Sequence, residues 1–217
     1  MDINAVIFVM DGVIFDTEAV SQRRWFEYGD SFGFYNIKEV YPKIIGTNSA
    51  DTRRIMINEY KDAEKVAEFL NVTRERFFEI LRTEGIPLKP GVKELLLRLK
   101  AKGYRTALAS STATDTVKSE LSQTGLIDYF DFIIGGDKVK KSKPNPEIFL
   151  KAAEGLGVSV SEAIIIEDSH NGIRAASRAG IFSIMVPDLM PVTDEMKSLA
   201  GLVLCSLFEV KEFILKQ

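Results

Sequence analysis

Five short apolar runs, separated by segments with helical periodicity, constrain the fold of this 217-residue chain more than any other feature. Most residues in each run are apolar, without the strict alternation of a half-exposed strand. Such strands, alternating with helices, are typical of a parallel sheet covered on both faces. The sequence therefore predicts an α/β fold with a Rossmann-like, doubly wound parallel sheet. The predicted strands are Ala5–Val9, Arg105–Ala109, Phe132–Ile134, Ala163–Ile166 and Phe182–Val186.

Helical periodicity continues without a strand from about Thr17 to Glu84. A helical block placed directly after the first strand is typical of an inserted cap. We therefore predict an α/β core domain of residues 1–15 and 88–217, and a helical cap domain of residues 16–87. The cap helices are expected at Glu18–Gly29, Ala50–Glu59, Ala63–Leu70 and Arg74–Glu84, and the core helices at Val92–Lys102, Ala113–Thr124, Glu147–Leu156 and Gly172–Ala179.

Charge and composition exclude several classes of partner. The net charge is −3 and no basic run occurs, so no nucleic acid is expected to bind. No apolar run approaches the ~20 residues of a membrane span, and we expect no membrane association. Cys205 is the only cysteine, so an internal disulfide is impossible and a cytoplasmic location is the default expectation.

Polar residues follow four of the predicted strands. In an open parallel sheet, ligands bind beyond the carboxyl ends of the strands. Hydroxyls, a lysine and carboxylates are the groups that bind phosphoryl oxygens and a hard divalent metal. The sequence therefore predicts a phosphate and metal site at this edge. Its members in chain order are Asp11 and Gly12, Ser110 and Ser111, Lys143 and Asn145, and Glu167 and Asp168.

These segments resemble the four motifs of the haloacid dehalogenase superfamily, in the right order and over nearly the whole chain. The first motif, Asp-x-Asp-Gly-(Thr/Val), corresponds to the stretch Val9-Met10-Asp11-Gly12-Val13. The second corresponds to Ser110, the third to Lys143, and the fourth to Glu167 and Asp168. Within the superfamily the chain is most similar to β-phosphoglucomutases and sugar-phosphate phosphatases, which carry a small helical C1-type cap.

The resemblance implies a Mg²⁺-dependent phosphatase that acts on a small phosphorylated metabolite such as a sugar phosphate. It assigns Asp11 as the general acid and base, with its backbone carbonyl on the metal. Ser110 and Lys143 would bind phosphoryl oxygens, while Asp168, with Glu167 beside it, would hold Mg²⁺. Further candidates for substrate binding are Gly12, Trp25, Ser111 and Asn145.

Val9 departs from the family pattern, because it stands where the resemblance requires the nucleophilic aspartate. Valine offers neither a nucleophile nor an oxygen for a metal. Residues two apart on a strand face the same side, so Val9 and Asp11 would flank one phosphoryl group. Loss of a nucleophile typically costs several orders of magnitude in rate. We therefore expect a folded chain that is catalytically impaired.

Other functions compete with the phosphatase prediction. The resemblance to β-phosphoglucomutases would place an arginine near Ser49 and a histidine near Ser21; no histidine occurs there, and Arg53 and Arg54 are near Ser49 but out of register. A non-catalytic phospholigand binder stays open, because Val9 removes turnover and not binding. A receiver-type signalling domain also pairs acids with a Lys-Pro, but the inserted cap argues against it. By analogy with small capped proteins, we expect a monomer.

Overall fold

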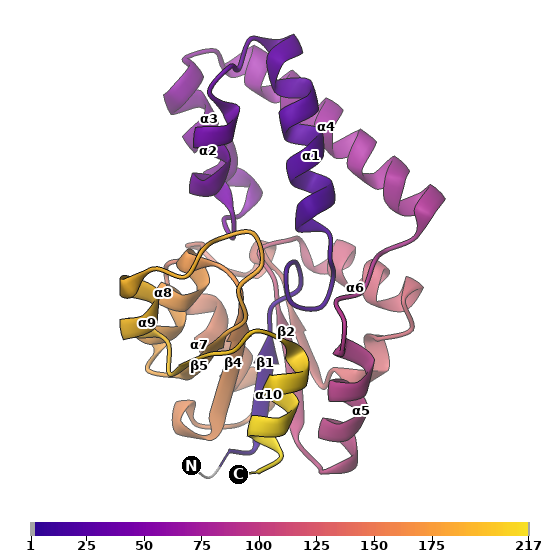
Figure 1. The fold of residues 1–217 in the computed structure, drawn as a ribbon, viewed down its shortest axis with the longest axis vertical. Coiled ribbons are helices and arrows are strands. Elements are labelled where there is room, and N and C mark those ends of the chain that lie inside the picture. Colours follow the sequence, from indigo (N-terminus) through magenta and orange to yellow (C-terminus); the bar gives the residue numbers. More distant parts are fainter. Residues whose placement is uncertain (1–2, 217) are drawn as a thin grey trace.

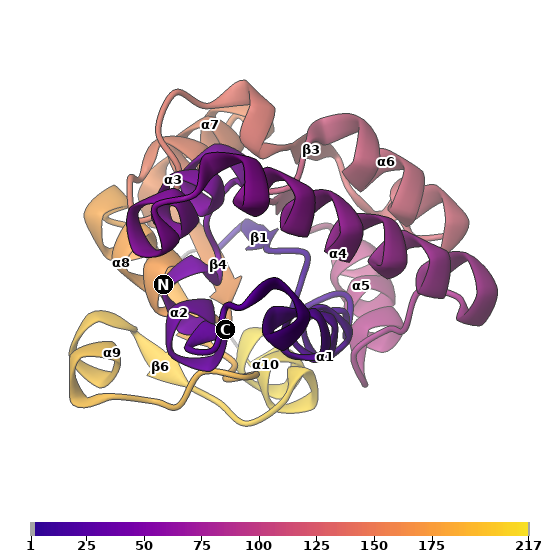
Figure 2. The same ribbon diagram turned by 90° about the horizontal axis from the view of Figure 1, so that it is seen from above.

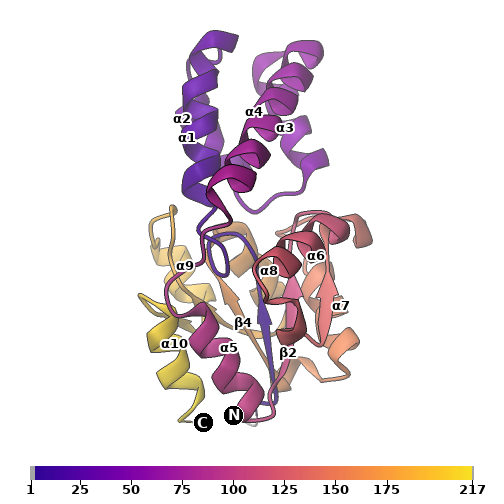
Figure 3. The same cartoon turned by 90° about the vertical axis from the view of Figure 1, so that its right-hand side faces the viewer.

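The chain folds into a parallel sheet with helices on both faces and a helical layer above one edge (Figures 1 and 3). The computed structural model describes residues 3–216. The strand order is β3-β2-β1-β4-β5-β6, and all neighbours pair in parallel. The predicted Rossmann-like α/β fold is therefore confirmed. The strands are β1 Ala5–Phe8, β2 Arg105–Ala109, β3 Phe132–Ile134, β4 Ala163–Glu167, β5 Phe182–Met185 and β6 Leu202–Val203.

The two central strands explain why their sequences lack alternation. Every residue of β1 and of β4 is buried, because helices cover both faces of the sheet. Ile7 pairs with Ala107 on one side and Ile165 on the other, so these strands share one apolar core. The helices around this core are α5 Val92–Ala101, α6 Thr114–Gln123, α7 Glu147–Leu156, α8 His170–Ala179, α9 Asp194–Leu199 and α10 Leu207–Ile214, and the short 3-10 helices are Asp30–Phe32, Ile127–Tyr129, Gly136–Lys138 and Val160–Glu162.

Four helices lie above the carboxyl edge of the sheet (Figure 2). They are α1 Glu18–Gly29, α2 Ile37–Ile44, α3 Ser49–Tyr60 and α4 Ala63–Glu84. They enclose an aromatic cluster of their own, in which Phe69 packs edge-on against Trp25 and Phe34. This cluster is separate from the core beneath the sheet. The two clusters support the proposed division into a core (residues 1–15 and 88–217) and a cap (residues 16–87).

The chain enters and leaves the cap through two adjacent segments. The amide of Asp16 donates to the carbonyl of Pro87 at 2.9 Å, and the amide of Lys89 donates to the carbonyl of Ile14 at 3.0 Å. The side chain of Lys89 also forms ion pairs with Asp16 and with Asp188 of the core. Both connections are therefore tied to one another and to the sheet domain.

Some elements differ from the sequence predictions. The helices predicted at 63–70 and 74–84 form one continuous helix, α4, because Thr73 is buried and bonds back to the carbonyl of Phe69 instead of breaking the helix. The short helix α2 was not predicted because it contains Pro42, which lowers helix propensity. Strand β6 has two residues, too few for a periodic signal, and α9 and α10 were also missed. Within residues 3–216, no helix has both the length and the apolar character that crossing a membrane requires.

Candidate active site

A cavity of about 250 Å³ lies between the carboxyl edge of the sheet and the cap. It opens where the strand order reverses beside β1, the position at which open α/β sheets bind ligands. Its volume is just below the roughly 300–1,000 Å³ of drug-sized ligand sites, so it suits a small metabolite. The predicted site residues that line it are Val9, Asp11, Trp25, Ser110, Ser111, Lys143, Glu167 and Asp168.

A tight turn after β1 places Asp11 at the floor of this cavity. The amide of Ile14 donates to the carbonyl of Met10 at 2.8 Å, which reverses the chain within a few residues. Gly12 adopts a φ of +78°, and a Cβ there would lie 2.3 Å from Oδ2 of Asp168. Only glycine allows this backbone conformation together with so close an approach. Gly12 therefore brings the Asp168 carboxyl directly against the turn that carries Asp11.

Asp168 is buried and Asp11 is half-buried, and both carboxyl groups line the cavity. Thr17 Oγ1 donates to Oδ1 of Asp11 at 2.5 Å and fixes its orientation. Burial raises the pKa of Asp11, an effect that the hydrogen bond from Thr17 and the charge of Lys143 only partly offset. Burial, and then the neighbouring charge of Glu167, raise the pKa of Asp168 well above its ordinary value. The site therefore favours bound protons or a bound cation over bare carboxylates.

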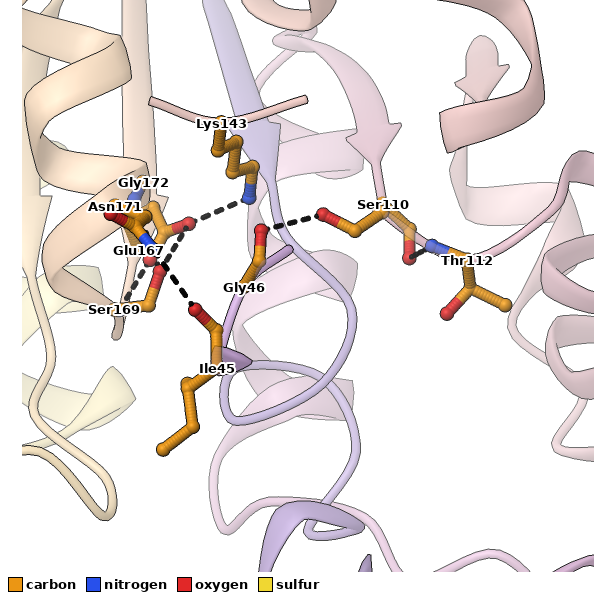
Figure 4. A network of polar contacts seen from close by, with 10 residues as sticks. Ile45, Gly46, Ser110, Thr112, Lys143, Glu167, Ser169, Asn171 and Gly172 are labelled. Carbon is orange, nitrogen blue, oxygen red and sulfur yellow. Dashed lines mark hydrogen bonds and ion pairs between the residues drawn. The ribbon is translucent and has the colours of Figure 1, made fainter. Parts of the chain in front are cut away.

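Lys143 and Glu167 form a buried ion pair, with 2.6 Å between Nζ and Oε1 (Figure 4). The two side chains are only 4% and 1% exposed. The amide of Ser169 donates to Oε2 of Glu167 at 2.5 Å, so both carboxylate oxygens accept bonds. A Cβ at Gly172 would lie 1.6 Å from Oε1, so α8 can pack on this carboxylate only with glycine there. Glu167 thus holds the lysine amine in place.

The serines after β2 have different partners. Ser110 is buried, and its Oγ accepts from the amide of Thr112 at 3.0 Å, leaving its own proton for another acceptor (Figure 4). Ser111 Oγ donates to the carbonyl of Gly46 in the cap at 2.9 Å. Asn171 likewise donates to the carbonyl of Ile45 at 3.3 Å. Ser111 therefore fastens the cap to the core as well as lining the cavity.

Asn145 is not brought into the cavity. Its Oδ1 accepts from the amide of Glu147 at 3.0 Å, at the start of α7. Asn145 instead lines a separate surface depression together with Leu150 and Glu154. Its position favours a role in beginning the helix over the predicted role in substrate binding.

Val9 directly follows β1 and lines the cavity beside Asp11. It is 4% exposed, and its amide donates to the carbonyl of Ile166 at 3.2 Å. The backbone at this position is therefore ordinary sheet-edge structure. What position 9 lacks is a side-chain oxygen.

The cavity also has walls that were not predicted from the sequence. Glu18 and Tyr41 come from the cap, and the tyrosine hydroxyl donates to Glu18 Oε2 at 3.2 Å. Burial, with the nearby charge of Asp11, raises the pKa of Glu18 to about 8. On the core side, Glu120 of α6 lines the cavity close to Phe77 and Phe78 of α4. Glu120 could have been recognised from the sequence as an unusual position, because it interrupts the apolar face that Val117 and Leu121 form on α6.

The donor set fits a magnesium ion that is shared with a phosphate ester. Asp11 and Asp168 supply hard oxygen donors, and the contact at Gly12 brings one against the turn that carries the other. Mg²⁺ is usually bound by one or two carboxylates together with phosphate oxygens and waters. Over residues 3–216, no three Asp, Glu, His or Cys side chains gather closely enough to form a metal cage. Val9 contributes nothing to such a group.

A parallel α/β sheet with a helical cap inserted after the first strand is the fold of capped α/β hydrolases. The chain belongs to the haloacid dehalogenase-like hydrolase family, whose model matches residues 6–186. The predicted family membership is therefore confirmed.

Three similar proteins illustrate the relationship. The phosphorylated carbohydrates phosphatase of Thermotoga maritima is 35% identical over 180 residues, covering 82% of each protein. The structure of β-phosphoglucomutase from Clostridium difficile superimposes with a TM-score of 0.81 and 28% identity, covering 99% of this chain and 96% of that one. CbbY from Rhodobacter sphaeroides, solved in complex with phosphate, gives a TM-score of 0.78 at 29% identity, covering 96% of both chains.

Proposed function

We propose that this chain carries the active site of a phosphatase for a small phosphorylated metabolite, with sugar phosphates as the first class to test, in which Val9 occupies the nucleophile position. The observation that carries the proposal is the arrangement around Val9. Asp11, Ser110, Lys143 and Asp168 all line the same cavity as this residue. The curated relative named as a phosphorylated carbohydrates phosphatase supports the substrate class.

In a chain with aspartate at position 9, the reaction has two displacements. A carboxylate oxygen attacks phosphorus, the bond to the leaving oxygen breaks, and Asp11 gives that oxygen its proton. Water then attacks the aspartyl-phosphate, Asp11 takes up a proton, and phosphate leaves. The raised pKa of Asp11 favours the protonated acid that the first displacement needs. Valine cannot make the first bond, so we propose that the present chain binds the ester without turning it over.

The remaining site residues stabilise the negative charge of the phosphoryl group. Lys143, held by Glu167, neutralises negative charge on the phosphoryl oxygens, and Ser110 donates its free proton to one of them. Asp168 and the Asp11 carbonyl would hold Mg²⁺, which offsets the remaining charge on phosphate when bound. Glu167 is better suited to positioning Lys143 than to binding metal, because both its oxygens already accept hydrogen bonds.

The cavity favours a phosphatase over a phosphomutase. A mutase must bind a second phosphate of a bisphosphate, which calls for a cation on the cap side. Among the described residues that line the cavity, Lys143 is the single basic side chain, and it is already paired with Glu167. The neutral and acidic cap wall therefore supplies no basic side chain for a second phosphate.

A non-catalytic phospholigand binder is a second function that Val9 itself favours. The ion pair, the Gly12 turn and the cavity are all present without a nucleophile. Such a protein would bind a phosphate ester in the presence of Mg²⁺ and release no phosphate. It differs from an inactivated phosphatase in one testable property. In a true binder, an aspartate at position 9 would not produce turnover.

The Val9→Asp substitution tests the proposal. Groups that act as a unit are non-additive, so one replacement can return most of a lost rate. We expect Mg²⁺-dependent phosphate release from sugar phosphates or an aryl phosphate to rise by at least ~10²-fold over the Val9 chain, toward the ordinary range of roughly 1–10³ per second. Phosphate release across a panel of esters is the measurement.

Val9→Asn is the matched control, because it has the shape of the aspartate without its nucleophilic oxygen. It should stay as inactive as the Val9 chain. Asp11→Asn in the Val9→Asp chain should remove most of the gain. If the Val9→Asp chain folds, binds Mg²⁺ and cleaves no ester, the phosphatase proposal is wrong and the binder takes its place.

A further inference from the structure

Glu120 is an acidic residue on the cavity wall that the proposed chemistry does not use. It lies on α6 and is 7% exposed. Among residues 3–216, no side chain or backbone group bonds to its carboxylate, although its own backbone carbonyl accepts from Thr124. Its carboxylate oxygens are not enclosed by the protein, because the residue borders both the cavity and a neighbouring groove, so a ligand in the cavity can reach them.

Within residues 3–216, no ion pair joins a basic side chain to this carboxylate, and the nearest charged side chains in the adjoining groove are Arg82 and Asp115. Burial raises the pKa of Glu120 to about 8, and the charge of Asp11 adds to the increase. The described cavity lining holds five carboxyl side chains and one amine, which is already paired. Mg²⁺ and phosphate would offset charge near Asp11. The α6 side of the cavity would still have an excess of carboxyl groups over hydrogen-bond donors and positive charge.

The surroundings of Glu120 form a place for the non-phosphate end of a substrate. Thr116 lies one turn earlier on α6 and lines the same cavity, and Phe77 and Phe78 line it from α4 of the cap. Thr116, Phe78 and Glu120 also line a groove that continues between α4 and α6. Glu120 therefore stands where the cavity meets this groove, on a wall that combines aromatic rings with a carboxylate and a hydroxyl.

We infer that Glu120 is a specificity-determining residue that accepts a hydrogen bond from an ammonium or hydroxyl group on the leaving group of the phosphate ester. The inference rests on the proposed function and adds a substrate class to it, namely esters with a donor at the end remote from phosphorus. Aromatic walls beside a carboxylate suit an ammonium group, and the hydroxyl of Thr116 suits a sugar. An ammonium group and a sugar hydroxyl would each supply the hydrogen-bond donor that Glu120 lacks.

A buried acid that only supports packing would look similar in the structure but would behave differently. Glu120→Gln keeps the shape and removes the carboxyl group that can become charged when a donor binds. The Val9 chain is convenient here, because we expect it to bind an intact ester without cleaving it. Binding is measured by calorimetry in Mg²⁺ with four probes: glucosamine 6-phosphate, glucose 6-phosphate, methyl phosphate and inorganic phosphate.

We expect Glu120→Gln to weaken binding of at least one of the two sugar esters by ~10-fold or more, since hydrogen bonds to charged groups contribute roughly 1.5–3 kcal/mol. Methyl phosphate and inorganic phosphate, which carry no donor beyond the phosphoryl group, should bind within twofold of the unchanged chain. A loss confined to glucosamine 6-phosphate identifies the ammonium group, and a loss for glucose 6-phosphate identifies a hydroxyl. Glu154→Gln, an exposed glutamate on α7, is the control and should change neither.

Three results would overturn the inference. One is an equal loss for all four probes, which would indicate a structural role. Another is unchanged binding of both sugar esters. A third is that neither chain binds any probe, inorganic phosphate included, in which case the proposed function fails as well. In the Val9→Asp chain, Glu120→Gln should likewise raise KM for the affected sugar ester.

Discussion

The two ends of the cavity are built differently. At the sheet end, Asp11, Ser110 and Glu167 each have hydrogen-bond partners that fix their orientation, and Lys143 is locked in a buried ion pair. At the α6 and cap end, no group within residues 3–216 bonds to the Glu120 carboxylate, and the remaining wall combines aromatic and aliphatic side chains with hydroxyls and Glu18. The difference suggests a division of labour. The end that handles phosphate is organised before a ligand arrives, and the other end is completed by the ligand.

The largest loss of stability should come from disrupting the sheet end of the cavity, where hydrogen bonds and an ion pair already fix the side chains. Lys143→Met leaves Glu167 buried without its cation, and removing one partner of such a pair typically costs ~3–5 kcal/mol. We expect that loss in the free energy of unfolding, measured by urea denaturation, together with loss of phosphate binding.

The control for this prediction is Lys151→Met, which removes an exposed partner of Glu147. Exposed pairs contribute only ~0–1 kcal/mol, so this change should be small. Adding Glu167→Gln to Lys143→Met should recover part of the stability, because the unpaired charge is removed. Equal effects of Lys143→Met and Lys151→Met would mean that the sheet end is no more organised than the surface.

An intermediate effect should come from adding a carboxylate to the same end. Without Mg²⁺, Val9→Asp places another acid beside Asp11 and Asp168, whose pKa values are already raised by burial. We expect the Val9 chain to melt at the higher temperature under those conditions, by ~1–2 kcal/mol in stability. In calorimetric titrations, Val9→Asp should bind Mg²⁺ at least ~10-fold more tightly. Equal affinities would show that position 9 is not a metal ligand, and a lower melt for the Val9 chain would refute the stability argument.

A further effect concerns pH and the acids at the α6 and cap end. The pKa of Glu120 and that of Glu18 are both raised to about 8 from an ordinary 4.5. Between these values the folded chain keeps protons that the unfolded chain has lost, so stability is highest below pH 4.5 on their account and falls as the pH rises through 8. The melting temperature of the metal-free chain should therefore decline from about pH 5 to 8, and Glu120→Gln should flatten the decline. A melting temperature that rises over this range would contradict the assignment.

These two ends also differ in how far sequence alone predicts them. Asp11, Ser110, Glu167 and Asp168 follow directly from the ends of apolar strands, and the topology of a parallel sheet brings strand ends together. The Rossmann-like fold was predicted for the same reason. The exact partners were not, because the pairing of Lys143 with Glu167 depends on where a long loop folds back.

The cap end depends on how one helical layer sits upon another. Glu120 and Phe78 meet in the cavity although 42 positions separate them, and nothing in the periodicity of either helix encodes the angle between α4 and α6. Asn145 shows the opposite failure. It follows a motif lysine closely in sequence, yet it bonds at the start of α7 outside the cavity. Closeness to a motif in the sequence was a weaker guide than position at a strand end.

The paired linkers have a consequence for how such a protein can change over evolutionary time. Because Asp16 and Pro87 are hydrogen-bonded neighbours, as are Ile14 and Lys89, the intervening cap begins and ends at almost the same point in space. Closing that gap with a short turn would cost little chain entropy, since the ends already meet. The cap is therefore an insertion whose two ends lie side by side. It can be exchanged for another without moving the turn and the loop of the core that hold Asp11 and Lys143, so new substrates can be acquired while the phosphate chemistry stays in place.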